Sequence, residues 1–573
     1  MKYIAPLDDF SFIINEVLGL DEILDLPNFS SFNSDLFSAV LQEAAKFAQT
    51  CLSPINQIGD KEGSNLENAK VKTPSGFKQA YHEFVQNSWN SVPFSPEIGG
   101  QGLPWLISTA ISEMWSGANM AFGLCPLLTQ GSIELLSHHG SSEQKATYLG
   151  KLVSGHWTGT MCLTEPQAGS DVGAITTKAT KNGDHYLIKG QKIFITYGDH
   201  DLTDNIIHMV LARLPDAQAG TKGISLFIVP KILHNSQNND VKTVSLEHKL
   251  GIHASPTAIL SFGDNNGAIG YLVGEENAGL KYMFTMMNNA RLAVGIEGIA
   301  VGENSYQMAL AYAKERIQSR EIGVKNDKPV TIINHPDIKR TLLNIRSNIF
   351  SMRLLALYIA KHIDIAKHHS DNSVKSKSQA IVDLLIPVVK AHSTNLGFLM
   401  SSEALQIFGG MGYIEETGIA QNLRDSRIAM IYEGTNGIQA LDLVMRKLTL
   451  ENGAYFNYFI DSITNELTKK SAGKAPNYYE KTKNGLQILS EATNQLQQLN
   501  NKNPQKSAFH ATPYLQLFGT VAGAAMLCLS ALAAEAKSDS PTYKEKIELA
   551  DYYANFILPS VYYIKDLVKI SVS

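Results

Sequence analysis

The sequence predicts an α+β multidomain fold, with a β domain between two helical regions and a further helical domain at the C-terminal end. Helical periodicity of apolar residues dominates residues 36–155 and returns over residues 279–448. Between these regions, short apolar runs of strand type alternate with turn signals. The length of 573 residues exceeds what one ordinary core accommodates, so several domains are expected.

Composition limits the class of protein. With 44% hydrophobic and 18% charged residues the chain is globular, and a formal net charge of −5 implies no polyanion-binding field. The four cysteines lie far apart without a C-x-x-C pair, so we expect no metal site and no disulfide framework. The first residues lack the basic and apolar regions of a signal peptide, so we expect a cytoplasmic protein.

The N-terminal half is predicted to contain three parts. Residues 1–37 have apolar pairs spaced for a short helix or two, and residues 38–160 form an all-α domain. Residues 161–279 form the middle β domain. Its expected strands are residues 185–196, 205–214, 223–231 and 255–262.

Residues 280–450 are predicted to form a helical bundle. The polar residues 369–379 are expected to be a solvated loop, and Pro387 is expected to kink the next helix or to start it anew. Methionines 283, 286 and 287 are interpreted as core residues.

An appended helical domain is expected over residues 451–573, and it contains the apolar run 515–534. Twenty residues are about enough to span a bilayer. Polar residues interrupt the run and no Lys/Arg cluster flanks it, so we expect a buried helix and no transmembrane segment. Gly519 and Gly523 lie four apart and allow close packing on that face, on the bundle or across a subunit interface.

The strongest candidate for chemistry is Glu433, which lies between Tyr432 and Gly434 ahead of a helix expected near Ile438. A carboxylate beside free backbone amides can remove a proton while the developing charge is stabilised. The same residues also suit an ordinary helix N-terminus with its acidic residue. The local sequence leaves both interpretations open.

A second stretch, residues 161–171, offers hydroxyls at Thr164 and Ser170 and a flexible backbone at Gly169. Period-2 alternation places Phe194 and Thr196 on one face of a strand. Neither stretch is a nucleotide-binding fingerprint. These residues predict only a polar, glycine-lined pocket on the β domain.

Five segments together resemble the acyl-CoA dehydrogenase family, in its order and spacing. They are residues 161–171, 194–196, 313–318, 406–413 and 431–435. The resemblance covers residues 38–450. The N-terminal Tyr3-Ile-Ala-Pro6 and the C-terminal extension resemble a longer bacterial branch that includes the 3-methylmercaptopropionyl-CoA dehydrogenases.

The resemblance implies the fold order given above, with FAD between the β domain and the bundle and a homodimer or homotetramer whose neighbouring subunit completes the site. It assigns to the cofactor Met161, Leu163, Thr164, Gly169, Ser170, Phe194, Thr196, Arg316, Gln318, Gln406, Gly409, Gly410, Thr435 and Asn436. It assigns to the substrate Ser170, Arg291 and Gly434. A few family members carry the base at the position of Ala290, which cannot take a proton, so Glu433 is the matching carboxylate.

The reaction implied by the resemblance converts an acyl-CoA to the trans-2-enoyl-CoA. Glu433 takes the α proton, a hydride leaves the β carbon for flavin N5, and the backbone N–H of Glu433 with a flavin ribityl hydroxyl stabilises the thioester oxygen. Electron transfer flavoprotein is the expected acceptor, in fatty acid β-oxidation or on a thioether acyl-CoA.

Three alternatives to this reaction are an oxidase, a nucleic-acid-binding relative and an inactive scaffold. An acyl-CoA oxidase would pass electrons to dioxygen, and the sequence does not separate it from a dehydrogenase. A flavin-bearing nucleic-acid-binding relative predicts a basic C-terminal domain, but residues 451–573 hold twelve lysines, no arginine and eleven acidic residues. A catalytically dead scaffold disagrees with the intact Glu433-Gly434-Thr435.

Overall fold

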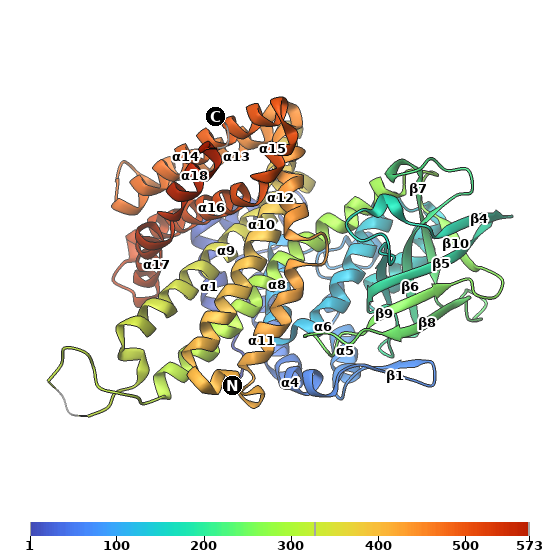
Figure 1. Ribbon diagram of the computed structural model, residues 1–573, viewed down its shortest axis with the longest axis horizontal. Coiled ribbons are helices and arrows are strands. Elements are labelled where there is room, and N and C mark those ends of the chain that lie inside the picture. The colour runs from blue at the N-terminus through green and yellow to red at the C-terminus, as the bar shows by residue number, and fades with distance from the viewer. Residues whose placement is uncertain (1, 326–327, 571–573) are drawn as a thin grey trace. The chain divides into compact units, whose positions relative to one another are not determined.

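The computed structural model describes residues 2–325 and 328–570, and the chain divides into two compact units. The helical unit comprises residues 1–46, 104–117 and 291–573, and the sheet unit comprises residues 47–103 and 118–290. The long helices α6 (Trp105–His139) and α8 (Gly279–Glu315) contribute residues to both. The predicted α+β organisation, with helices before and after a β region and further helices at the end, is confirmed (Figure 1).

The sheet unit is built around eight paired strands. They are β3 (Trp157–Cys162), β4 (Lys178–Asn182), β5 (His185–Thr196), β6 (Asn205–Arg213), β7 (Ile224–Pro230), β8 (Val241–Leu246), β9 (Thr257–Phe262) and β10 (Ala268–Leu272). Its helices are α4 (Ser53–Glu62), α5 (Phe77–Gln86), α7 (Ser142–Val153) and the parts of α6 and α8 that lie in this unit. A short hairpin joins β1 (Asn65–Glu67) to β2 (Lys70–Lys72).

Strand pairing closes part of this sheet on itself. Strand β10 pairs with both β5 and β7, and β7 continues through β6 and β4 back to β5. Strands β9 and β8 extend from β5, and β3 runs parallel to β6. The four strands expected from apolar runs are present as β5, β6, β7 and β9. Two of those missed, β4 and β8, keep mostly exposed or half-buried residues, so no apolar run marks them.

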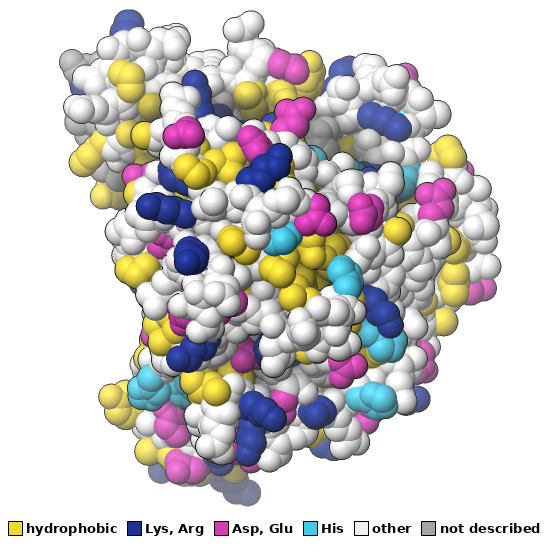
Figure 2. All heavy atoms as spheres, turned by 90° about the vertical axis from the view of Figure 1, so that its right-hand side faces the viewer, with side chains coloured by type: hydrophobic (Ala, Val, Ile, Leu, Met, Phe, Trp, Pro, Cys, Tyr) yellow, Lys and Arg dark blue, Asp and Glu magenta, His cyan; other side chains and the backbone are white. Residues whose placement is uncertain are grey.

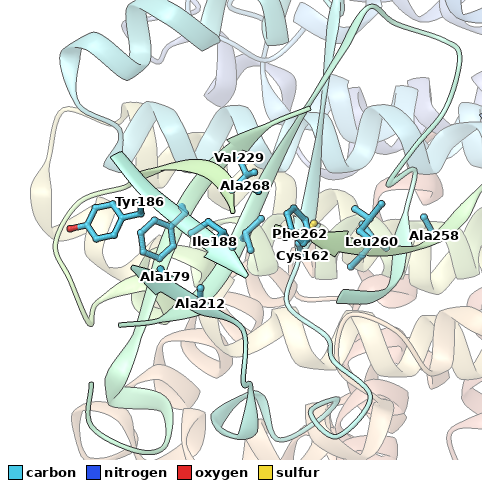
Figure 3. Packing of buried hydrophobic residues seen from close by; sticks show 13 residues of the cluster. Cys162, Ala179, Tyr186, Ile188, Ala212, Val229, Ala258, Leu260, Phe262 and Ala268 are labelled. Carbon is cyan, nitrogen blue, oxygen red and sulfur yellow. The ribbon is translucent and has the colours of Figure 1, made fainter. Parts of the chain in front are cut away.

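Alternate residues of the paired strands form the core of the sheet unit. Figure 3 shows Ile188 of β5, Val229 of β7, and Leu260 and Phe262 of β9 in one cluster. All four are at most 1% exposed. Burial of each such side chain stabilises the fold by roughly 1.5–3 kcal/mol relative to exposure, and this closed core holds the strand ends that carry the predicted site residues.

The bundle of the helical unit contains α8 from Arg291 onward, α9 (Pro336–His368), α10 (Asn372–Ile407), α11 (Ile419–Ser426) and α12 (Asn436–Met445). The prediction of a loop over residues 369–379 is wrong beyond residue 371, because α10 begins at Asn372. The Asp371 side chain caps this helix by accepting a hydrogen bond from the Ser373 N–H. The expectation that Pro387 restarts the helix is also wrong. Helix α10 continues through this buried residue, where packing against α9 outweighs the lost backbone hydrogen bond.

The C-terminal helices pack around one apolar helix. They are α13 (Ala454–Ser471), α14 (Asn477–Lys502), α15 (Pro504–Phe509), α16 (Ala511–Ala534), α17 (Pro541–Tyr552) and α18 (Ser560–Ile570). Helix α16 contacts α9, α10, α12, α14 and α17 within the helical unit. Among the described residues only this helix is long and apolar enough to cross a membrane, and 94% of its apolar window is buried inside the fold.

A buried ionic network joins the two ends of the chain to the bundle. The N-terminal α1 (Leu7–Phe12) places Asp9 against the guanidinium of Arg353 on α9, 2.6 Å away. Arg353 also contacts Glu113 on α6 at 2.6 Å and Glu303 on α8 at 2.8 Å. Lys546 on α17 contacts Asp9 at 2.6 Å. The network therefore bonds five helices, including both terminal additions, into one arrangement.

We predict that Gly519→Ala destabilises the protein. A Cβ at Gly519 would lie 2.3 Å from His392 Cγ on α10, so the imidazole of His392 or one of the two helices must shift. Overpacking of this kind typically lowers the free energy of unfolding by about 1–3 kcal/mol. The matched control is Gly150→Ala in α7, where a Cβ meets nothing within 4 Å and helix propensity favours alanine. Urea denaturation of both variants measures the difference, and equal stability would contradict the close packing at Gly519.

Candidate active site

Glu433 lies in a strained turn immediately before a helix. Its φ is 55°, in the left-handed region that non-glycine residues rarely occupy, and Gly434 follows with φ 82°. The Thr435 side chain then accepts a hydrogen bond from the Ile438 N–H at 3.2 Å and caps α12. The helix begins at Asn436, two residues earlier than expected. Residues held in such a conformation persist only where their surroundings fix them, and they concentrate at functional sites.

Three helices hold this turn by its carbonyl groups. Arg291 Nε on α8 lies 3.5 Å from the Glu433 carbonyl oxygen, which Gln439 Nε2 on α12 approaches at 3.3 Å. Lys390 Nζ on α10 donates to the Gly434 carbonyl at 2.8 Å and to Asn436 Oδ1 at 2.9 Å. The backbone that carries the Glu433 carboxylate is therefore fixed from α8, α10 and α12 together.

The carboxylate of Glu433 itself has no hydrogen-bond partner among the residues that the structure describes. Burial in this site raises the pKa of Glu433 to about 7, against the nearby charges of Arg291 and Lys390, which lower it. A general base is most effective when its pKa lies near the working pH. The arrangement therefore presents a fixed, unengaged carboxylate suited to accept a proton near neutral pH, which favours the catalytic interpretation over a simple helix cap.

In the sheet unit, a buried ion pair brings the two predicted cofactor-contacting segments together. Lys192 on β5 is 0% exposed, and its Nζ donates to Glu165 Oε1 at 2.8 Å and to the Leu163 carbonyl at 2.9 Å. The Ile193 N–H donates to the Thr164 carbonyl at 2.9 Å. Burial raises the pKa of Glu165, but Lys192 and further hydrogen bonds outweigh it and bring that pKa to about 2. The segment after β3 is thus bound along β5.

A β-bulge sets the exposure of Phe194. The register between β5 and β9 shifts by one residue between Lys192 and Ile195, and Phe194 has a φ of 58°. The bulge interrupts the pleat just before Ile195, so regular alternation does not extend from Lys192 to Ile195. Phe194 is nevertheless 58% exposed and Thr196 is half-buried, while Ile195 between them is buried.

The other predicted site residues lie mostly on exposed backbone. Met161 and Thr164 are half-buried, Leu163 is buried, and Gly169 and Ser170 are exposed in the sheet unit. Gln406, Gly409 and Gly410 are exposed where α10 ends, and Arg316 with Gln318 is exposed where α8 ends. Within the helical unit, only Arg291, Glu433, Gly434, Thr435 and Asn436 of the predicted set form one cluster among the described residues.

Several residues that support the predicted ones were not expected from the sequence. Lys390, Gln439 and Glu297 surround the Glu433 turn, and Lys192 and Glu165 fix the segments of the sheet unit. A charged residue inside an otherwise apolar element was the available signal, since Lys192 stands in a strand and Lys390 in a buried helical run. Their partners lie far away in sequence, so the pairing itself was not predictable.

Four family models match consecutive parts of the chain. They are the N-terminal domain of acyl-CoA dehydrogenase over residues 36–156, the middle domain over 160–265, the C-terminal domain over 277–448, and the acetyl-CoA dehydrogenase C-terminal-like domain over 459–571.

Similar proteins extend over nearly the whole length. A 3-methylmercaptopropionyl-CoA dehydrogenase of Ruegeria pomeroyi is 43% identical, over 97% of this chain and 96% of its own. A butyryl-CoA dehydrogenase of Syntrophomonas wolfei is 33% identical, over 100% and 97%. A crystal structure of an acyl-CoA dehydrogenase complexed with FAD from Bacillus anthracis shares the fold with a TM-score of 0.78 at 22% identity, covering 98% of this chain and 92% of that one.

We predict that Lys192→Met destabilises the sheet unit, because it leaves Glu165 buried without its cation. Removing one partner of a buried ion pair typically lowers the free energy of unfolding by about 3–5 kcal/mol. Lys189→Met is the matched control, because Lys189 lies on the same strand and is exposed. Urea denaturation followed by circular dichroism compares the two variants. A loss at Lys192 no larger than that at Lys189 would show that the pair does not stabilise the fold.

Proposed function

The chain belongs to the acyl-CoA dehydrogenase family and is an FAD-dependent oxidoreductase acting on a CH–CH bond, and from this premise we propose that Glu433 is its catalytic base. The observation that carries the proposal is the unengaged Glu433 carboxylate on a turn fixed by Arg291, Lys390 and Gln439. A carboxylate that makes no hydrogen bond to the described residues of the protein is available to the substrate.

The α proton next to a thioester is very weakly acidic, so its removal needs both a well-placed base and stabilisation of the charge that develops on oxygen. The near-neutral pKa of Glu433 makes the carboxylate a stronger base than an exposed glutamate, whose pKa is close to 4.3. The clamps on the carbonyls of Glu433 and Gly434 keep the carboxylate in one position during proton removal. The backbone N–H of Glu433 is the donor that we assign to the thioester oxygen.

The residues present fit a planar, phosphate-bearing cofactor. A Cβ built at Gly169, Gly409 or Gly410 meets nothing within 4 Å, so each presents open backbone, and the bulge of β5 holds Phe194 outward with an exposed aromatic ring. We assign the segment 161–170 with Phe194 and Thr196 to the flavin ring. Arg316 and Gln318 are assigned to the pyrophosphate of a neighbouring subunit's cofactor. The adenosine end is assigned to Gln406, Gly409 and Gly410. Thr435 and Asn436 are assigned to the turn that lies next to the cofactor. When bound, FAD supplies the acceptor for the hydride that leaves the β carbon.

We infer that the substrate is a short acyl-CoA, with a thioether acyl-CoA such as 3-methylmercaptopropionyl-CoA as the first candidate. The support is the relative of that name at 43% identity over almost the entire chain. A second candidate is an unsubstituted short acyl-CoA, supported by the butyryl-CoA dehydrogenase at 33% identity over the full length. Arg291, Ser170 and Gly434 are the residues that we assign to substrate binding.

The remaining functional assignments follow from the same family. We propose a cytoplasmic homodimer or homotetramer that passes electrons to electron transfer flavoprotein and serves acyl-CoA breakdown. On the face drawn in Figure 2, lysine and arginine side chains are interspersed with acidic ones, which does not favour a nucleic-acid-binding surface there.

We predict that Glu433→Gln folds, retains FAD and binds acyl-CoA but loses turnover. Removal of a general base typically lowers the rate by on the order of a hundred- to ten-thousand-fold. The measurement is flavin reduction by substrate under anaerobic conditions, with one FAD per chain checked by absorbance. The control is Glu480→Gln on the exposed face of α14, which should keep the wild-type rate. If Glu433→Gln reduced its flavin as fast as the control, the base would lie elsewhere.

We predict that 3-methylmercaptopropionyl-CoA gives the highest kcat/KM in a panel of short, medium, long, aromatic and thioether acyl-CoAs. The assay uses an artificial electron acceptor, and parallel aerobic reactions measure peroxide. Highest kcat/KM with butyryl-CoA would favour the second candidate, and preference for long chains would reject both. Stoichiometric peroxide formation would identify an oxidase instead of a dehydrogenase.

A further inference from the structure

Two buried charged residues that the reaction scheme above does not use lie behind the Glu433 turn. Lys390 on α10 is 0% exposed, and Glu297 on α8 is 1% exposed. Each is bonded to a residue adjacent in sequence to Glu433. Lys390 bonds the carbonyl of Gly434, and Glu297 accepts a hydrogen bond from the hydroxyl of Tyr432.

Lys390 has an unusual set of partners for a buried cation. Both of its hydrogen bonds, to Gly434 O at 2.8 Å and to Asn436 Oδ1 at 2.9 Å, end on neutral oxygens. Among the described residues no carboxylate lies within ion-pair distance of it. Burial lowers the pKa of Lys390 to about 7, while the carboxylates of Glu433 and Glu297 raise it. The charge of Lys390 is therefore balanced across space by the proposed base itself and by Glu297.

Glu297 is the opposing group. Its Oε2 accepts from Tyr432, whereas its buried Oε1 has no hydrogen-bond partner in the described part of the chain. Burial raises the pKa of Glu297 to about 8; the Tyr432 hydrogen bond and Lys390 lower it, and Glu433 raises it. A buried carboxyl left half-satisfied lowers stability, which points to a role other than packing.

We propose that Lys390 and Glu297 are positioning residues that control the proton affinity of Glu433 in opposite directions, through the turn that carries it. The ammonium of Lys390 fixes the Gly434 carbonyl and favours the ionised carboxylate. The carboxyl of Glu297 holds Tyr432 and, when ionised, repels the Glu433 carboxylate. This inference rests on the proposed role of Glu433 as the base.

Other charged groups face the same cluster within the helical unit. Arg291 on α8 contacts Asp442 on α12 at 3.8 Å, and Arg446 also bonds Asp442, at 2.6 Å. The pKa of Tyr432 is raised by burial and by Glu297, and the charge of Asp425 on α11 raises it further. These groups are unchanged in every variant described below, so differences between variants report on Lys390 and Glu297. Because Glu433, Lys390 and Glu297 titrate in one range, the measured midpoint belongs to the coupled cluster.

The expected direction of each pH shift follows from charge. The base works when ionised, so the rate falls as the pH drops through its midpoint. Lys390→Met removes a cation that favours ionisation, and the midpoint should rise by about one pH unit. Glu297→Gln removes a carboxyl that opposes the ionisation of Glu433 when it is itself ionised, so the midpoint of the coupled cluster should fall. Lys390→Arg keeps a permanent cation, so its midpoint should stay at or below that of the wild type.

The experiment measures anaerobic flavin reduction in the holoenzyme over a range of acyl-CoA concentrations, up to saturation, on both sides of pH 7. Each variant is first checked for FAD content and thermal midpoint. We expect opposite shifts for Lys390→Met and Glu297→Gln, a lower maximal rate for Lys390→Met with little change in KM, and partial rescue by Lys390→Arg. Lys377→Met, at an exposed position of the same helix, is the control and should leave the profile unchanged.

If the pH midpoints stay unchanged while the maximal rates fall, the two residues have a purely structural role and the proposal is overturned. Shifts of the pH midpoint in the same direction for Lys390→Met and Glu297→Gln would also overturn it. If Lys390→Met fails to fold, Glu297→Gln and Lys390→Arg still decide the question through their own shifts. Failure of the proposed base is a separate result. In that case Glu433→Gln would keep its rate, whatever Lys390 and Glu297 do.

Discussion

The left-handed turn at Glu433 and Gly434 is the constraint on which the proposed active site depends. A non-glycine residue at φ 55° keeps this conformation only if its surroundings stabilise it. Here the stabilising groups come from three separate helices, with Arg291 on α8, Lys390 on α10 and Gln439 on α12. The turn therefore exists only when the bundle is assembled, and the local sequence around Glu433 cannot form it alone.

The assembly of that bundle relies in turn on the network around Arg353. Helix α8 carries Arg291 and Glu297 of the proposed active site. It also carries Glu303, six residues after Glu297, which contacts Arg353. The same guanidinium binds Asp9 from the N-terminal segment, and Lys546 from α17 binds Asp9 as well. Burial of these charges is unfavourable unless all of them are paired. The N-terminal segment and α17 are thus bonded into the same network as α8, the helix that carries Arg291 of the proposed site.

The sequence predicted the α+β organisation, the strands with continuous apolar runs, and Glu433 as a candidate base through its resemblance to a family. It did not predict the strands β4 and β8, because their exposed residues carry no apolar signal. The bulge at Phe194 arises from pairing with β9 more than sixty residues away, which no local period reveals. Lys390 and Glu297 stand in helices that otherwise look like ordinary core, and only the three-dimensional contacts reveal their relation to Glu433.

Both units use a buried lysine that bonds a backbone carbonyl beside a functional segment, but the two lysines have different consequences. Lys192 contacts Glu165 directly at 2.8 Å, and the pKa of Glu165 falls to about 2, so this carboxylate stays ionised near neutral pH. Burial lowers the pKa of Lys192, and the contact with Glu165 raises it. Among the described residues Lys390 bonds only neutral oxygens, and the carboxylates of Glu433 and Glu297 act on it from beyond ion-pair distance. Burial brings the pKa values of Lys390 and Glu433 to about 7. The direct ion pair of Lys192 and Glu165 holds both side chains in place and moves the pKa of the carboxylate away from neutral pH. Because Lys390 bonds the backbone of the turn and not the Glu433 carboxylate, Glu433 can still gain or lose a proton near neutral pH. A proton-accepting site requires this property.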